Sequence, residues 1–509
     1  MLDAGLLALA ATSLLAATPD APQAAPRPTE GVSLTVYSSA DPAGFNPQQF
    51  VQQQRMSGMD NVWGVPGYGV VKEVRRVAVP KGVGDLAFTD VAAWIDPTTV
   101  SFNDLDDANT TVLEQNFQFD LVSPSKLMER YIGRTVTIAV PMGDGVSNVS
   151  GELLSANQGQ LVLRTADGIR MVPMQGAQVT LGELPGGLLT KPTLVWRLSS
   201  PAGGDHLVRT TYQTAGMTWR ADYNIVLDGT DTSAGLTGWV TLMNLSGASY
   251  QGADLKLVAG NVQKVQPQPR RMMTRGMDVE VMADSVVAGF EEKEFFDYHL
   301  YTLPRKTDVL QNSTQQIALF PPVDAFKVKK ELVFDFTGGL GNAGQPILDR
   351  DYVLARKGNP SILVSFANRK DNELGMPLPA GKIRVYKEDP ADGTLEFVGE
   401  DLIQHTPRNE TVKIRLGEAF DVVGERKRSD FTIDNAAKRM TETFEIELRN
   451  QKSRPQTVRV LERLFRWSNW KITGESDRFE KLDSNTVAFD ATIGAEETKT
   501  IRYTVTYTW

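Results

Sequence analysis

The stretch that decides the fold is "TIRYTVTYTW", residues 500–509, at the end of the chain. Apolar and aromatic side chains occupy every second position there: Ile501, Tyr503, Val505, Tyr507 and Trp509. Arginine and threonine fill the alternate positions. Successive side chains of a strand point to opposite faces, so the pattern predicts a β-strand with one buried face.

A terminal strand of this kind occurs in two classes of protein. It closes bacterial outer-membrane barrels, whose strands need about 9 to 11 residues at their tilt. Most other alternating segments of this chain are shorter, and a capped helix and proline-rich loops interrupt them. We therefore expect a strand of a soluble β-sandwich, with an outer-membrane β-barrel as the alternative.

Length, charge and cysteine content limit the possible functions. A chain of 509 residues is too long for one core and predicts several domains. The 53 lysines and arginines against 62 aspartates and glutamates give a net charge of −9, without a long basic run. We therefore expect no nucleic acid as partner. The absence of cysteine excludes disulfides, thiol catalysis and thiolate metal sites.

The N-terminus predicts export. Residues 4–17, "AGLLALAATSLLAA", are apolar but too short to span a membrane, and a Pro/Ala-rich segment follows. We interpret residues 1–30 as a signal peptide and linker, although Asp3 stands where a positive charge is usual. No other apolar run is long enough for a membrane helix, so we do not expect an integral helical membrane protein. The expected location is the periplasm or cell envelope.

The first half of the chain divides into two predicted units. Residues 31–134 form an N-terminal β domain that ends in a short helix within "SPSKLMERYIG", where Ser123 caps and Pro124 takes the first helical position. Residues 135–184 contain about five short strands at tight spacing, typical of a small β-barrel of the Sm type.

The second half is a β-sandwich region in two parts. Residues 190–345 form the first part, which a mobile loop at 264–294 interrupts, and residues 346–509 form the C-terminal part. The predicted fold class is therefore all-β: several β-sandwich domains in tandem with an inserted small Sm-type barrel and very little helix.

One motif recurs in the β-sandwich region. A strand runs into an asparagine and a polar turn at Asn244, Asn368 and Asn450. Asparagine tolerates positive φ and hydrogen-bonds nearby backbone, so it suits the end of a sandwich strand. We interpret the motif as architecture and not as chemistry.

Longer blocks resemble a known family. "TYQTAGMTWRADYNIVL" (211–227) and "LTGWVTLMNLSGASYQGADLKLVAGNV" (236–262) resemble the bacterial domain-of-unknown-function family found in mucoidy inhibitor A-like proteins. The likeness extends over residues 32–509. It implies a secreted protein rich in β-sandwich and carries over no catalytic residues. Some members have a coiled coil between their halves, which this chain lacks.

Histidine and tryptophan supply the candidate site residues. His299 in "FDYHLYT" and His405 in "LIQHTPR" lie in family-like blocks, with Arg408 near the second, but neither has the spacing of a zinc pair, so we expect no metal site. Trp467 and Trp470 in "RLFRWSNWKI" would stack on sugar rings if exposed, or pack in a core if buried.

Two further motifs fail as ligand sites. "GLGNAG" (339–344) has the dinucleotide-binding spacing, but no helical pattern follows it, so we expect a loop and no cofactor. The acidic run "NDLDDAN" (103–109) has oxygen ligands suited to calcium but not the spacing of an EF-hand, which favours solvated turn carboxylates.

These observations predict an exported, non-enzymatic protein of the bacterial cell envelope that acts as a binding or structural scaffold. Its expected partner is an envelope protein or a surface polysaccharide. A polysaccharide-binding module and an envelope hydrolase are the alternatives, and the hydrolase would need two carboxylates in one cleft.

Overall fold

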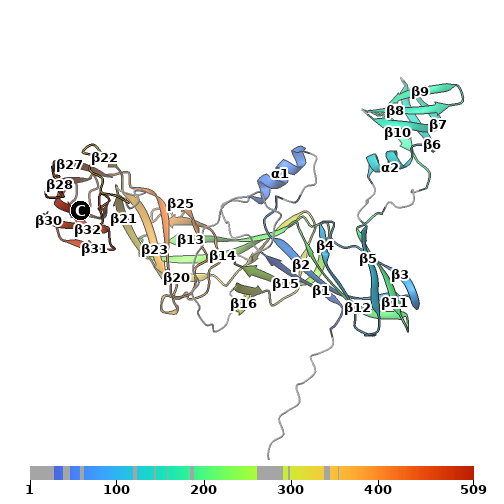
Figure 1. Cartoon of the computed structure of the whole chain (residues 1–509), viewed down its shortest axis with the longest axis horizontal. Coiled ribbons are helices and arrows are strands. Elements are labelled where there is room, and N and C mark those ends of the chain that lie inside the picture. The colour runs from blue at the N-terminus through green and yellow to red at the C-terminus, as the bar shows by residue number, and fades with distance from the viewer. Residues whose placement is uncertain are drawn as a thin grey trace, which may run out of the picture.

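The fold was analysed in a computed structural model, which describes residues 28–37, 46–57, 62, 64–118, 123–142, 145–157, 159–183, 189–260, 290–295, 298–336, 344–352 and 355–509. The predicted signal peptide and most of the predicted loop at 264–294 lie outside these residues. Strands make up about 64% of the structure and helices 4%, which confirms the all-β fold class. The strands of the described residues form six sheets (Figure 1).

The largest sheet combines both halves of the sequence. Its order is β16-β17-β15-β1-β2-β12-β4, and β18 pairs with β15. β1 pairs in parallel with β15, so the segments 31–134 and 190–345 share this sheet. The strands are β16 (Glu291–Phe295), β17 (Tyr298–Thr302), β15 (Tyr250–Ala259), β1 (Gly31–Tyr37), β2 (Tyr68–Val79), β12 (Gly204–Thr214), β4 (Ile95–Asp104) and β18 (Thr307–Val309).

Two sheets pack in the same core as the largest one, and a third sheet contributes Val364, Phe366, Val412 and Ile414 to it. A three-stranded sheet has the order β3-β11-β5, with β3 (Gly82–Thr89), β11 (Thr193–Ser200) and β5 (Thr111–Gln118). The other sheet has the order β19-β14-β13-β24-β25, and β20 pairs with β14. Its strands are β19 (Ser313–Ala318), β14 (Ser233–Asn244), β13 (Met217–Leu227), β24 (Gly381–Glu388), β25 (Leu395–Ile403) and β20 (Val323–Lys327).

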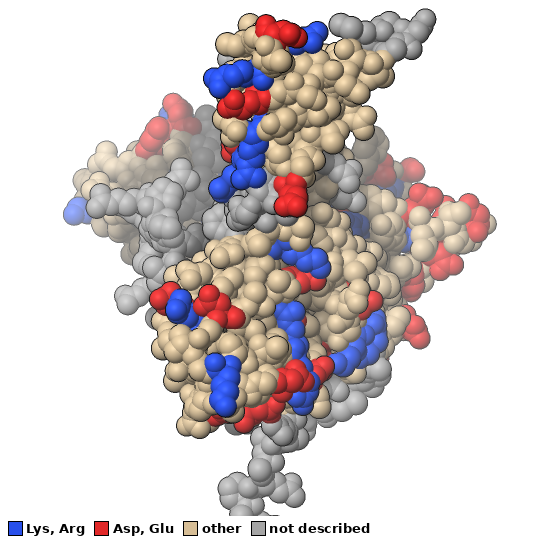
Figure 2. All heavy atoms as spheres, turned by 90° about the vertical axis from the view of Figure 1, so that its right-hand side faces the viewer, with Lys and Arg blue, Asp and Glu red and all other residues tan. Residues whose placement is uncertain are grey.

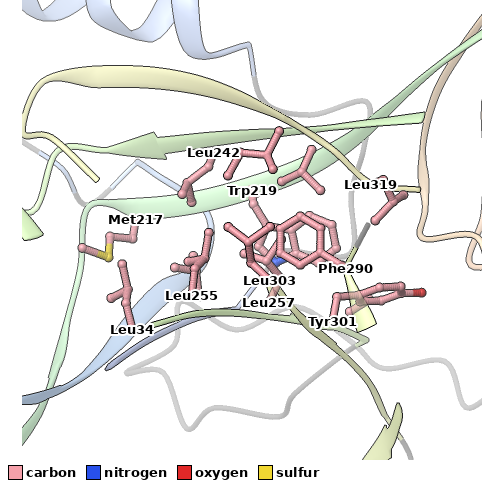
Figure 3. Close-up of a cluster of buried hydrophobic side chains, with 14 of the residues drawn as sticks. Leu34, Met217, Trp219, Leu242, Leu255, Leu257, Phe290, Tyr301, Leu303 and Leu319 are labelled. Atoms are coloured by element: carbon pink, nitrogen blue, oxygen red, sulfur yellow. The ribbon is translucent and has the colours of Figure 1, made fainter. Parts of the chain in front are cut away.

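The core between the largest sheet and the β13–β14 sheet is aliphatic and aromatic. Leu34, Leu255 and Leu257 face Met217, Trp219 and Leu242 across it (Figure 3). Trp219 meets Tyr301 edge to face, with ring centroids 6.2 Å apart. Edge-to-face packing places the positive ring edge against the negative ring face, so this contact fixes the relative position of β13 and β17.

The predicted small barrel is an open sheet. Residues 135–180 form the predicted strands, with β6 (Thr135–Met142), β7 (Gly145–Asn157), β8 (Gln160–Thr165), β9 (Gly168–Pro173) and β10 (Gln178–Thr180). They pair in the order β10-β6-β7-β8-β9, and no ladder among the described residues joins β9 to β10. The sheet has its own small core around Ile138, Leu153 and Leu163. Figure 2 shows this unit above the β3-β11-β5 end, with acidic and basic side chains intermixed.

Two sheets form the C-terminal sandwich. One has the order β26-β23-β21-β29-β32-β31 and the other β22-β27-β28-β33-β30. The first contains β26 (Thr411–Glu418), β23 (Ser361–Ala367), β21 (Lys329–Asp335), β29 (Gln456–Arg463), β32 (Thr486–Ile493) and β31 (Phe479–Lys481). The second contains β22 (Ala355–Gly358), β27 (Val422–Asp434), β28 (Arg439–Asn450), β33 (Thr498–Thr508) and β30 (Trp470–Glu475).

The last strand behaves as its pattern predicts. In β33, Ile501, Tyr503, Val505 and Tyr507 are buried in the core between the two C-terminal sheets. Tyr503 packs against Phe444 of β28 and Phe489 of β32, at 5.4 Å between ring centroids in each case. The aromatic face of this strand therefore packs inside the protein.

Helix is scarce. The described residues contain α1 (Pro47–Ser57), α2 (Pro124–Arg130) and the 3-10 turn η1 (Lys370–Asn372). Ser123 caps α2 by accepting from the backbone N–H of Lys126, as predicted. No helix in the described part of the chain has the length and apolar character required to cross a membrane.

Candidate functional site

Asn368, which follows β23, holds the loop that carries His405 to the loop of residues 375–380. Its side-chain nitrogen donates to the carbonyl oxygens of Met376 and Pro407, at 2.7 and 2.9 Å. Its side-chain oxygen accepts from the backbone N–H of Gly375 at 3.0 Å. A fully buried amide thus satisfies backbone groups from both loops, which is what a loop needs where water is excluded.

Further contacts fix the same two loops. The backbones of Leu378 and Thr406 exchange two hydrogen bonds of 2.9 Å. The hydroxyl of Tyr301 on β17 donates to the carbonyl of Pro377, and that of Tyr223 on β13 donates to the carbonyl of Pro379. Burial raises the pKa of both tyrosines well above the ordinary value, so both hydroxyls keep their protons as donors.

His405 is part of this loop structure. Its Nδ1 accepts from the backbone N–H of Ala380 at 3.1 Å, which requires the proton of the neutral ring to be on Nε2. Burial, followed by the charge of nearby His299, lowers the pKa of His405. His405 is therefore a neutral hydrogen-bond acceptor at neutral pH.

His299 belongs to a second, more exposed set of contacts. Its Nδ1 lies 2.7 Å from Oε1 of Glu292 on the neighbouring strand β16. Arg408 approaches the other oxygen of the same carboxylate at 3.4 Å. Burial would raise the pKa of Glu292, but the hydrogen bond from His299 and the charges of His299 and Arg408 outweigh it and hold the pKa below the ordinary value.

The structure therefore brings the two predicted histidines together and adds Glu292. We name His299, Glu292, Arg408 and His405 the histidine cluster. Glu292 was assigned to the predicted loop 264–294, whereas residues 291–294 lie in β16, so the end of that prediction was wrong. The only sequence signal was the carboxylate's position shortly before "FDYHLYT".

The chemistry open to the histidine cluster follows from its partners. Nδ1 of His299 is hydrogen-bonded to Glu292, so a further partner of this ring would bind at Nε2. Among the described residues, no group of three or more histidine, aspartate or glutamate side chains has the arrangement of a metal site. In the contacts described here, the cluster joins the β16–β17 hairpin to the loop of residues 404–408.

Trp467 and Trp470 pack against the core of the C-terminal sandwich. Both are half-buried there. The indole N–H of Trp470 donates to the carbonyl of Ser484 at 2.8 Å, and Lys481 lies 4.8 Å from the centre of its ring. Internal contacts thus occupy one edge and one face of Trp470.

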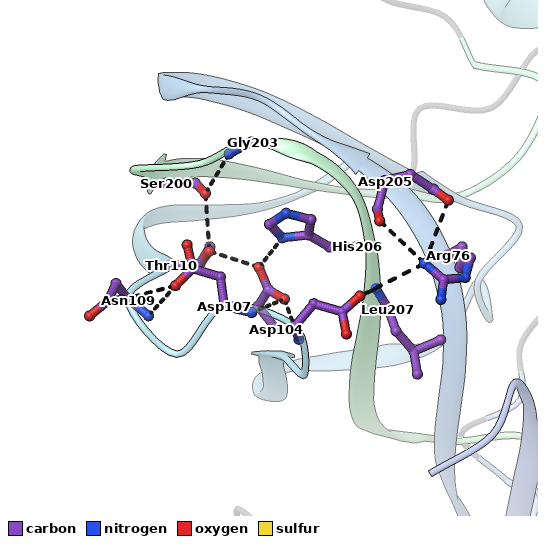
Figure 4. Close-up of polar contacts among 11 residues, drawn as sticks. Arg76, Asp104, Asp107, Asn109, Thr110, Ser200, Gly203, Asp205, His206 and Leu207 are labelled. Atoms are coloured by element: carbon purple, nitrogen blue, oxygen red, sulfur yellow. Dashed lines mark hydrogen bonds and ion pairs between the residues drawn. The ribbon is translucent and has the colours of Figure 1, made fainter. Parts of the chain in front are cut away.

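His206 was not among the candidate site residues, yet it is buried beside the acidic run of residues 103–109. Its Nδ1 donates to Oδ2 of Asp104 at 2.6 Å, and Thr110 donates to the same oxygen at 2.7 Å (Figure 4). The other oxygen of Asp104 accepts from the backbone N–H groups of Asp106 and Asp107, at 3.0 Å each. The acidic run predicted to form solvated turns therefore contains a buried carboxylate, Asp104, that anchors β12 to β4.

The three repeated asparagines share one role. All three are buried, and each donates to two backbone carbonyls of neighbouring segments. Each side-chain oxygen accepts a backbone N–H: that of Ser246 for Asn244, Gly375 for Asn368 and Lys452 for Asn450. None of the three has positive φ, so the side-chain amide and not the backbone conformation explains the motif.

Fold and site define an all-β protein of several stacked sheets whose loops are held by buried amides. Residues 208–509 match the family described as "Domain of unknown function (DUF4139)". The match covers more than half of the chain, and the protein belongs to this family. It begins inside β12 and includes the histidine cluster and the three asparagines. No curated protein matches the chain in sequence.

Proposed function

We propose that this protein is an exported, non-enzymatic component of the bacterial cell envelope that acts as a binding and structural scaffold. The observation that carries the proposal is that the candidate chemical groups are engaged in contacts that hold the structure together. His405 and Asn368 hold loops, and Glu292 is bound by both His299 and Arg408. Residues engaged in this way keep a surface rigid and present loops for binding.

The N-terminal sequence supports export. Residues 4–17 have the length and apolar character of the central region of a signal peptide, and small residues follow. The resemblance to mucoidy inhibitor A-like proteins supports the same assignment to the envelope. The proposed partner is an envelope protein or a surface polysaccharide.

Export is tested by expressing the full chain with its own N-terminus in a Gram-negative host. We expect a periplasmic or envelope-bound product that lacks the apolar segment, as measured by fractionation and intact mass. Leu7→Asp, which interrupts the apolar run, should trap the uncleaved chain in the cytoplasm, whereas the matched variant Leu7→Ala should be exported. An intact wild-type chain in the cytoplasm would contradict the proposal.

A polysaccharide-binding function has specific support, but from a different surface than Trp467 and Trp470. That surface lies on the β13–β14 sheet.

A further inference from the structure

The sheet β19-β14-β13-β24-β25 buries one face in the main core, and its opposite face is partly exposed. Trp219, Tyr223 and Ile383 belong to the buried face, which packs in the main core. Strand registers place the opposite side chains in rows across the sheet, and we name this side the outer face. One row contains Trp239, Asp222 and Lys382, and the next contains Thr237, Asn224 and Arg384.

Three aromatic side chains lie on the outer face. Trp239 on β14 is 38% exposed and Phe397 on β25 is 56% exposed. Tyr386 of β24 is paired with Phe397 in the ladder and meets its ring edge to face, at 5.7 Å between centroids. Solvated sheet faces normally carry polar side chains, so exposed aromatic residues on such a face indicate a binding surface.

Polar side chains with planar donor and acceptor groups separate the aromatic residues. Arg384 lies between Glu400 and Asp222, at 3.5 and 3.8 Å from their oxygens. Arg220 donates to Asp222 at 3.1 Å, and Lys382 donates to Glu400 at 2.9 Å. The carboxylates thus hold three cationic groups in place across the middle of the face.

The ion pairs in the middle of the face contain more cationic than anionic side chains. The side chains of Arg220, Lys382 and Arg384 are all partly exposed, whereas Asp222 is buried beneath them. Glu400 is the exposed carboxylate within this set of ion pairs. Within this set of ion pairs, three cations accompany one buried and one exposed carboxylate, and exposed Glu388 lies at the end of β24 beyond Tyr386. On a chain whose net charge is −9, partly exposed cations in the middle of the face favour an anionic ligand.

We propose that the outer face binds an acidic polysaccharide, with Trp239 and the Tyr386–Phe397 pair stacking on sugar rings and Arg384 and Lys382 contacting sugar carboxylates. Aromatic rings pack against the C–H faces of a pyranose, and planar polar groups hydrogen-bond its hydroxyls. The proposal goes beyond the scaffold function, because it names a surface and a ligand class and does not depend on export.

The dimensions of the face suit a short stretch of polymer. Trp239 lies on β14 and Tyr386 on β24, two strands away. The two residues are also two rows apart, and two rows correspond to four residues along a strand. With strands about 4.8 Å apart and a rise of about 3.3 Å per residue, their Cα atoms are separated by roughly 16 Å. A segment of several sugars lying flat would contact both aromatic groups and the cations between them.

The test uses the purified full-length chain and sodium polygalacturonate as the probe, with affinity measured by calorimetry. We expect the wild type to bind and Trp239→Ala and Phe397→Ala each to bind about tenfold more weakly. Arg384→Gln should also weaken binding and reduce its dependence on salt concentration. The matched control is Phe420→Ala, because Phe420 is 90% exposed and lies outside the outer face.

Three results would overturn the proposal. They are absence of binding by a folded wild type, unchanged affinity in both aromatic variants, and equal affinity for the carboxyl-reduced polymer. Thermal unfolding of each variant shows whether it is folded. Since Phe397 is exposed on an edge strand, Phe397→Ala keeps the test decisive even if Trp239→Ala unfolds.

Discussion

Arg426 and Glu462 form an ion pair inside the C-terminal sandwich, in which Nε of Arg426 donates to both carboxylate oxygens at 3.0 Å. Both side chains are almost completely buried. The hydroxyl of Tyr503 donates to Glu462 at 2.5 Å, and the guanidinium lies 3.8 Å from the centre of the Phe444 ring. Burial would lower the pKa of Arg426, but the charge of Glu462 outweighs it and raises the pKa, so Arg426 stays charged.

Removing one member of this pair should destabilise the protein more than removing both. Arg426→Met leaves a buried carboxylate without its partner and should reduce the free energy of unfolding by about 3–5 kcal/mol. The double variant Arg426→Met, Glu462→Met should recover most of this loss. Denaturant unfolding measures both, with Arg459→Met as control, because its pair with Asp490 lies at the surface and should contribute at most about 1 kcal/mol. Equal losses for the single and double variants would contradict this account.

Replacing Asn368 should lower the stability of the protein more than the loss of one small side chain suggests. Asn368→Ala leaves two carbonyls and one N–H of the adjoining loops without their partner, a loss of roughly 1–3 kcal/mol for each group left buried. We expect lower stability and faster hydrogen exchange in residues 375–380 and 405–409. Asn469→Ala is the control, since Asn469 is exposed. Unchanged exchange in both loops would show that other contacts suffice to hold them.

The pair His206 and Asp104 predicts a pH window of stability. The hydrogen bond to Asp104, opposed by burial, raises the pKa of His206, so its contribution is complete below about pH 6.5 and is lost as pH rises through the folded-state pKa. Burial would raise the pKa of Asp104, but hydrogen bonds from His206 and Thr110 outweigh it and lower the pKa. The contribution of Asp104 is therefore present above about pH 3.9 and is lost as pH falls.

The stability difference between wild type and His206→Asn should therefore be largest near pH 5 and shrink above neutral pH. Unfolding midpoints at a series of pH values measure it. A difference that does not change between pH 5 and pH 9 would rule out the charged pair.

The contribution of Glu292 to the stability of the β16–β17 hairpin should depend on pH in the acid range. Since its pKa is lowered in the folded state, its contribution is present above about pH 4.3 and is lost as pH falls through the folded-state pKa. Glu292→Gln should therefore increase hydrogen exchange in the β16–β17 hairpin at pH 7 but have little effect at pH 3. The control is Glu418→Gln, whose surface pair with Arg415 lies elsewhere. Equal effects of Glu292→Gln at the two pH values would contradict a stabilising role of the ionised Glu292 carboxylate.

Local pattern predicted the local elements well. The alternation of residues 501–509 identified β33 and its buried face, and Ser123 with Pro124 identified α2. These features depend on neighbouring residues and on strand or helix periodicity, which a sequence displays directly.

Features that depend on distant pairing could not be predicted in this way. Leu34 pairs with Leu255 across more than two hundred residues, and this parallel register places residues of the first predicted domain in the sheet of another. The strands at 135–180 were predicted, but closure into a barrel depends on whether the edge strands meet. Glu292 and Arg408 meet for the same kind of reason, since β16 and the loop of residues 404–408 are joined by tertiary contacts.

The two tryptophan sites also show that exposure on a shared sheet face depends on distant pairing. Trp470 is close to a strand end and looked suited to sugar, yet its ring packs on a core. Trp239 alternates with buried Val240 and Leu242, and only the sheet register shows that it shares a face with Tyr386 and Arg384. A binding surface built from four strands has no signature in any one of them.

The most direct measurement of the central claim compares these two sites on one polymer. Binding of polygalacturonate is measured for Trp239→Ala and for the double variant Trp467→Ala, Trp470→Ala under the same conditions. The account predicts that the first loses about tenfold in affinity while the second retains wild-type affinity when folded. Loss of binding in the second with full binding in the first would place the ligand at the C-terminal sandwich and contradict the account.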